Sequence, residues 1–139
     1  MNAQEVATVP LFQEAPRARC IQVAQLAHRL GVPAGKGLAR EGELASEFFV
    51  IMDGTASVLR DGEVVRQLHP GDFFGEIALV GKPYRTATVV ANSEMEIVVM
   101  PRHEFRTMLA RFPRIAATVL TSASRRIVSD LQEPTAQKT

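Results

Sequence analysis

The residues best suited to chemistry in this chain are a glycine–glutamate pair and an arginine nine positions after the glutamate. Gly75 lacks a Cβ and lets the backbone approach a ligand, and Glu76 opens a run too short for more than a turn or two of helix. The first backbone N–H groups of such a run point outward and form a site for an anion. The guanidinium of Arg85 opposite these amides suits a phosphate group, and the carboxylate of Glu76 suits a sugar hydroxyl.

The neighbouring residues must hold this pair at a turn. Gly71 and Gly75 frame the turn, through which Phe73-Phe74-Gly75-Glu76-Ile77-Ala78-Leu79 runs. After Arg85, the alternation over residues 86–89 predicts a strand that leaves the site.

The composition is that of a single domain. A length of 139 residues with a hydrophobic share of 46% suits one globular core, and the net charge of +1 implies no bulk attraction to nucleic acid or membrane. Cys20 is the only cysteine, which excludes an internal disulfide and favours a buried apolar role for this residue. The sequence has no apolar run of about 18 residues and no signal-peptide pattern. We therefore expect a cytoplasmic protein without a membrane span.

Hydrophobic spacing predicts one helix followed by short strands. Residues 16–30 keep helical spacing and Gly31 is the expected stop. Between residues 35 and 100, glycines separate short segments, and Asp53-Gly54 and Asp61-Gly62 are expected hairpin turns. Close intervals between the strands favour a small antiparallel barrel or a double-sheet roll. The strands are expected over residues 48–52, 56–60, 63–68, 86–91 and 95–100.

Two more helices are predicted after the strands. Pro101 fits the first position of one helix, which Pro113 ends. The other is expected over residues 114–131, with an apolar side that could also support a homodimer. We therefore expect a domain over residues 10–131, with a flexible N-terminus over 1–9 and a flexible tail over 132–139.

Several of these segments resemble one known family. Phe74-Gly75-Glu76-Ile77-Ala78-Leu79 with Arg85-Thr86-Ala87-Thr88-Val89 is similar to the phosphate-binding cassette of cyclic-nucleotide-binding domains. The resemblance covers about residues 10–131. It implies an α+β fold, mainly β: an antiparallel β-roll, or double-stranded β-helix jelly roll, with an N-terminal helix and two C-terminal helices. Other segments that look like the family, in its order, are Val32-Pro33-Ala34-Gly35, Glu41-Gly42-Glu43, Phe48-Phe49-Val50-Ile51 with Gly54, and Leu68-His69-Pro70-Gly71-Asp72.

The resemblance also implies roles for the residues of the cassette. Arg85 would pair with the phosphate of cAMP or cGMP, the backbone N–H groups around Ile77 and Ala78 would complete its shell, and Glu76 would accept the ribose 2′-hydroxyl. Phe74, Gly75 and Ala87 belong to the same cassette. One departure is Tyr84, because in the family the proline more often directly precedes the arginine, and this leaves the loop shape open.

Three further positions have two readings each. Thr86 is an ordinary strand residue or reaches the phosphate or the base, and it does not settle the choice between adenine and guanine. Leu68 contacts the base or is part of the core. Arg126 stacks on the base as a lid or is a solvated helix charge.

These implications predict a cyclic-nucleotide sensor, with cAMP preferred, that moves its C-terminal helices and acts on an effector protein. The alternatives are an interaction module without ligand binding, or the ligand-binding part of a larger channel or regulator. Neither a cofactor nor catalysis is expected, because His28, His69 and His103 are scattered and no metal-ligand spacing or nucleophile motif occurs. Direct DNA binding is disfavoured, since only about eight residues follow the last predicted helix.

Overall fold

The core of the protein is a β-roll made of two facing four-stranded sheets. The structure, a computed structural model, describes residues 1–76 and 84–137, with side chains as far as residue 125 in the last helix. The first sheet has the strand order β1-β8-β3-β6 and the second the order β2-β7-β4-β5, and the paired strands are antiparallel. The strands are β1 (His28–Val32), β2 (Gly37–Ala39), β3 (Glu47–Asp53), β4 (Ala56–Arg60), β5 (Glu63–Leu68), β6 (Phe73–Phe74), β7 (Thr88–Ala91) and β8 (Met95–Pro101).

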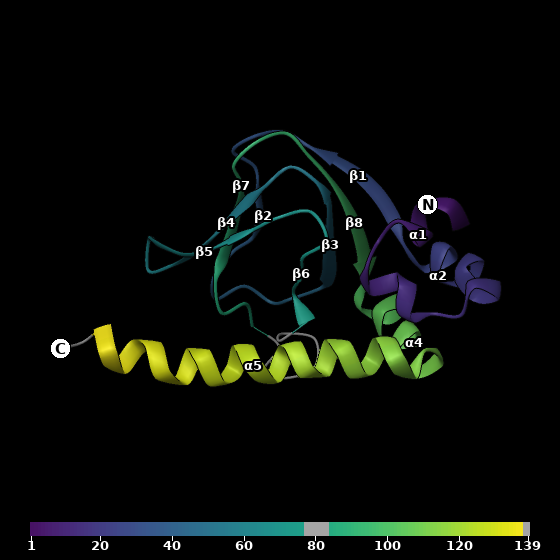
Figure 1. Ribbon diagram of the computed structural model, residues 1–139. Helices are drawn as coiled ribbons and strands as arrows, with labels where there is room; N and C mark the ends of the chain where they lie inside the picture. The colour runs from purple at the N-terminus through teal and green to yellow at the C-terminus, as the bar shows by residue number, and fades with distance from the viewer. Residues whose placement is uncertain (77–83, 138–139) are drawn as a thin grey trace.

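Helices cover the outer face of the first sheet and run beneath the roll (Figure 1). The ring of Phe48 on β3 stacks on Phe105 of α4, with 4.5 Å between the ring centroids. The long helix α5 follows α4 and extends under the roll toward β5. The helical elements are α1 (Ala3–Ala7), the 3-10 turns η1 (Leu11–Glu14) and η2 (Arg17–Arg19), α2 (Cys20–Leu26), α4 (Arg102–Arg111) and α5 (Pro113–Gln137).

Strand β3 is buried on both of its faces, which explains its continuous apolar sequence. Successive side chains of a strand point to opposite sides. Phe49 and Ile51 belong to the core inside the roll, whereas Phe48 and Val50 belong to the core between the first sheet and the helices. The roll therefore shares one wall with the helical part, and the mixed α+β fold with a mainly β roll is as expected.

The helix expected over residues 16–30 is shorter than predicted. The α-helix ends at Leu26, Ala27 is extended, and residues 28–32 form β1 along the edge of β8. The edge of β8 exposes backbone groups that only an extended partner can pair with over several residues. Leu30 is half exposed on this strand, so the apolar spacing that suggested a helix there was misleading.

Both chain ends contain helical residues. Residues 3–7 form α1, whose N-terminus carries a capping box between Asn2 and Glu5. Val6 and Val9 are buried in the core between the helices and the sheet. At the other end, α5 continues to Gln137, six residues beyond the expected end at Leu131.

Of the two expected hairpin turns, one is correct and one is wrong. Asp61 and Gly62 both have positive φ and join β4 to its partner β5, as in a two-residue hairpin. Asp53-Gly54 instead lies between the two sheets, since β3 pairs with β6 and β8 while β4 pairs with β5 and β7. The five predicted strands are present; β1, β2 and the two-residue β6 were not predicted.

The burial of the N-terminal segment leads to a test of its contribution to stability. Val6→Ala should lower the free energy of unfolding by about 2 kcal/mol, because two methyl groups leave a closely packed core. Gln4→Ala, at an exposed position on the same helix, is the matched control and should change it by less than about 0.5 kcal/mol. Urea unfolding followed by circular dichroism measures both. Equal, negligible effects would mean that the segment does not pack as described.

Candidate functional site

Arg85 is placed by its main chain as well as by its side chain. The N–H of Gly42 donates to the carbonyl of Arg85 at 2.9 Å, and the N–H of Arg85 donates to the carbonyl of Glu43 at 2.8 Å. Beside them, Leu44 and Tyr84 form an isolated antiparallel bridge. The Glu41-Gly42-Glu43 segment therefore fixes the point from which the Arg85 side chain enters the fold.

The guanidinium of Arg85 lies partly buried against the start of β3. Its Nη2 donates to the backbone carbonyl of Glu47 at 2.6 Å, and its Cζ lies 5.6 Å from the ring centroid of Phe49. Burial lowers the pKa of Arg85, and the nearby carboxylates of Glu47 and Glu76 oppose that shift. Because an arginine keeps its proton at any physiological pH, the site contains a permanent cation.

Gly75 provides the space that this guanidinium occupies. Its φ is +98°, and a Cβ built on it would lie 2.7 Å from Nη1 of Arg85 and 2.9 Å from the carbonyl oxygen of Glu47. The sequence predicted that glycine here allows a close approach to the backbone. The structure gives a specific reason, since a larger residue would collide with the arginine itself.

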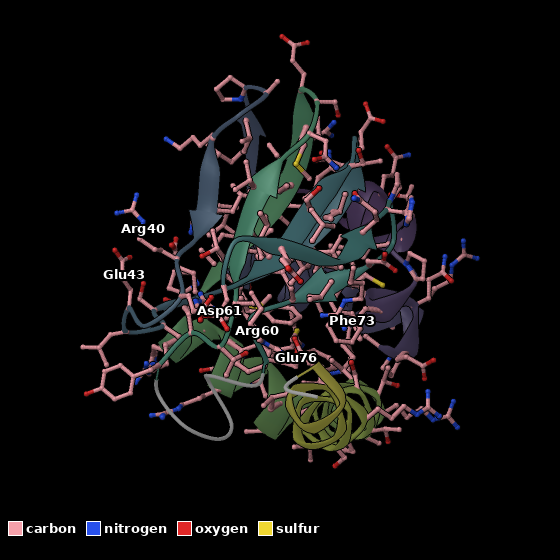
Figure 2. All side chains as sticks on the ribbon, turned by 90° about the vertical axis from the view of Figure 1, so that its left-hand side faces the viewer. Arg40, Glu43, Arg60, Asp61, Phe73 and Glu76 are labelled. Atoms are coloured by element: carbon pink, nitrogen blue, oxygen red, sulfur yellow. The ribbon has the colours of Figure 1, made fainter. Side chains whose placement is uncertain are left out.

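Glu76 is buried between the roll and α5. Its side chain has no exposed surface, and its Oε1 accepts a hydrogen bond of 3.4 Å from the hydroxyl of Ser122 on α5. Figure 2, in which α5 is seen end-on, shows Glu76 directly above the helix. The distance is at the long end for a hydrogen bond, so the contact is weak. The last helix nevertheless meets the carboxylate at the candidate site.

Three successive carbonyls link Arg85 to the start of α4. Arg102 is the first residue of α4, and its side chain donates to the carbonyl of Ala45. The backbone N–H of Arg102 donates to the carbonyl of Ser46 at 2.9 Å. The next carbonyl, that of Glu47, accepts from Arg85. The segment 45–47 thus contacts the site arginine at one end and α4 at the other.

The structure brings Gly75, Glu76 and Arg85 together, and it describes four of the other predicted residues. Phe74 and Leu68 are buried in the core of the roll, where the ring of Phe74 stacks on Phe49 at 4.7 Å. Thr86 is exposed and Ala87 is half-buried. Ile77, Ala78 and the side chain of Arg126 lie outside the described part of the chain.

Sequence reasoning missed the groups that hold the arginine and the glutamate. Glu47 contributes through its backbone carbonyl, which no side-chain pattern reveals. Ser122 could have been suspected, because it lies one helical turn before Arg126 and so on the same side of the predicted helix.

The described residues contain no other obvious chemical centre. Within residues 1–76 and 84–125, whose side chains the structure describes, no group of three or more His, Cys, Asp or Glu side chains could hold a metal ion. No helix in this part of the chain is long and apolar enough to cross a membrane.

The close approach at Gly75 leads to a test of the site geometry. Gly75→Ala should destabilise the protein by about 2 kcal/mol or more, because a positive φ and two contacts below 3.0 Å act together. Gly35→Ala is the control: its φ is +86° and nothing lies within 4 Å of the added Cβ. Thermal and urea unfolding measure the difference. If both variants lose the same stability, the arginine does not occupy the space beside Gly75.

Comparisons with known proteins point to one family. The family model of the cyclic nucleotide-binding domain matches residues 29–112. A cyclic nucleotide-gated potassium channel of Rhizobium etli is 35% identical over 125 residues, which are 90% of this chain and 35% of the channel. A cAMP-dependent protein kinase regulatory subunit of Schizosaccharomyces pombe is 30% identical over 102 residues, covering 73% of this chain and 25% of that protein.

Solved structures show the same fold. The catabolite activator protein of Thermus thermophilus superposes with a TM-score of 0.78 at 23% identity, over 93% of this chain and 63% of that one. This chain spans about a third or less of the channel and of the kinase subunit to which it is similar. The family model covers more than half of the sequence. The chain therefore belongs to the cyclic nucleotide-binding domain family.

Proposed function

We propose that this domain senses a cyclic nucleotide, cAMP in preference to cGMP, and that binding moves the C-terminal helices. The observation that carries the proposal is the contact between Ser122 of α5 and the buried carboxylate of Glu76. A ligand that uses Glu76 must compete with, or rearrange, the helix beneath it.

The cation of Arg85 is the proposed phosphate partner. Its guanidinium donates to a neutral carbonyl at Glu47, and a cyclic phosphate with one negative charge would be a stronger acceptor. The partly buried position strengthens the attraction, because less water screens the two charges. The amides around Ile77 and Ala78 are proposed to complete the phosphate shell.

The carboxylate of Glu76 is the proposed partner of the ribose 2′-hydroxyl. Ser122 donates to Oε1 of the same carboxylate, so the sugar and α5 would share one side chain. Ligand and helix position are then linked, and the ligand shifts the position of α5 by as much as its affinity differs between the two arrangements.

The purine base of the ligand would be held by residues outside the group formed by Gly75, Glu76 and Arg85. Leu68 and Arg126 remain proposed base contacts, the first from the roll and the second from α5, with Phe74, Thr86 and Ala87 completing the cassette. The preference for cAMP follows the similarity to a cAMP-dependent kinase regulatory subunit, and the similarity to a cGMP-dependent protein kinase makes cGMP the ligand to compare with it.

Two alternatives lead to different expectations. A domain that lost its ligand and serves only as an interaction module would bind no cyclic nucleotide. A domain that regulates a larger channel or enzyme would bind one, and the channel and kinase relatives support that possibility. Whether the domain senses a cyclic nucleotide alone or within a larger channel or enzyme, the signal would pass to an effector protein or to a homodimer formed through α5.

Calorimetric titration with cAMP, cGMP and 5′-AMP tests the proposal. We expect cAMP to bind more tightly than cGMP, and 5′-AMP to bind poorly, because its open phosphate carries additional charge near Glu76. Absence of binding by both cyclic nucleotides at millimolar concentration would favour the interaction module.

Replacing the proposed phosphate partner should remove most of the affinity. Arg85→Ala is expected to weaken cAMP binding at least about 30-fold, since the loss of one member of a buried charge pair costs roughly 2–5 kcal/mol. Arg106→Ala, at an exposed position on α4, should leave the affinity unchanged. Titration of both variants gives the comparison. An unchanged affinity of Arg85→Ala would remove this residue from its role.

Removing the hydroxyl of α5 should have the opposite effect. Ser122→Ala is expected to tighten cAMP binding by about twofold, because a weak hydrogen bond, worth about 0.5 kcal/mol, no longer holds α5 on Glu76. Ser124→Ala, at an exposed position on the same helix, is the control. Equal affinities of the two variants would show that the contact does not oppose binding.

A further inference from the structure

A basic groove lies at the N-terminal end of α5, away from the cyclic-nucleotide site. It encloses about 520 Å³ between the N-terminal residues 13–19 and the junction of α4 with α5 at residues 111–114. Arg19, Arg111 and Arg114 line it, and Glu14 is its single carboxylate. The chain as a whole carries a net charge of only +1, so this is a local concentration of positive charge.

The three arginines of this basic groove form no ion pair within the part of the chain that the structure describes. Arg19 lies over the ring of Phe112, with its Cζ 4.8 Å from the ring centroid. It donates to the side-chain oxygen of Gln22 at 3.1 and 3.2 Å and to the carbonyl of Arg111 at 3.5 Å. These acceptors are neutral, so they orient the guanidinium of Arg19 without compensating its charge.

We propose that the basic groove binds an acidic, extended segment of a partner protein. Guanidinium groups pair with carboxylates through two parallel hydrogen bonds, and Arg19 is already held in place for such a pair. Pro16 and Pro113 supply apolar surface in the same groove. A segment with carboxylates on either side of one apolar residue matches this pattern.

The same features argue against a nucleic acid or a membrane as the occupant. Binding along a nucleic-acid backbone needs a stripe of many cations, and a lipid surface needs a broad basic face. Here the arginines surround one groove of limited volume, and Glu14 would repel a dense row of phosphates. A short peptide with spaced carboxylates meets less of this repulsion.

The position of the basic groove gives the bound segment a role in regulation, which rests on the proposed function. One wall belongs to the N-terminal turns and the other to the start of α5, so a segment that spans both walls favours one placement of α5. Farther along α5, Ser122 donates to the carboxylate of Glu76. The groove is thus a second site that reads the position of the helix, as coupling between two ligands requires.

The binding test uses fluorescent peptides of about eight residues, long enough to cross the groove when extended. Each has glutamates on both sides of one Leu, Phe, Met or Val, and matched peptides contain glutamine in place of glutamate. Anisotropy is recorded at about 0.15 M salt, where exposed charges are well screened. A short DNA duplex and vesicles containing phosphatidylglycerol are tested in parallel.

The charge-reversed variant Arg111→Glu/Arg114→Glu should lose at least about tenfold in affinity for the best acidic peptide. Arg106→Glu adds the same kind of change at an exposed site outside the groove, and it should lose less than about twofold. The variant Arg111→Ala/Arg114→Ala should also weaken binding, and its far-ultraviolet circular dichroism should show that the fold is intact.

Three results would overturn the proposal. They are equal binding of the glutamate and glutamine peptides, equal losses in the groove variant and in Arg106→Glu, and a groove-dependent preference for DNA or vesicles. A separate titration of cAMP with and without saturating peptide tests the coupling. If the peptide binds and cAMP does not, the proposed sensor function fails while the groove stands; if both bind independently, only the link to α5 is lost.

Discussion

The position of the Arg85 guanidinium depends on two neighbouring backbone features. The absence of a side chain at Gly75 leaves room for the guanidinium, and the carbonyl of Glu47 accepts one of its N–H groups. A charge that is partly removed from water must find acceptors, and a neutral carbonyl satisfies it without cancelling it. The result is a fixed cation beside a buried carboxylate, an arrangement suited to an anion that also carries a hydroxyl.

Strand β3 joins the core of the roll to the core of the helical part. Phe49 and Ile51 of β3 fill the roll, whereas Phe48 and Val50 of the same strand pack toward α4 and the N-terminal turns. A closely packed interior transmits a change in volume instead of absorbing it. The core of the roll and the core of the helical part therefore lie on opposite faces of the same strand.

The sequence predicted the roll well, and it predicted that Gly75, Glu76 and Arg85 lie together, because both depend on local signals. Short apolar segments separated by glycine indicated the strands, and the glycine–glutamate pair with its arginine indicated the site. What was missed depends on partners distant in sequence. Whether residues 28–32 form helix or strand is decided by the edge of β8, and the two Asp-Gly turns differ only in which strands they join. A two-residue strand such as β6 has no periodicity to detect.

The segment Ala45–Glu47 carries a consequence of its own. Its three carbonyls connect Arg85 to the first residue of α4, and none of its side chains is needed for these contacts. Alanine scanning would not detect a signal transmitted along this segment, because a side-chain substitution preserves every backbone carbonyl. Replacing single amides by esters, or following the exchange of individual amide protons, would be required to see it.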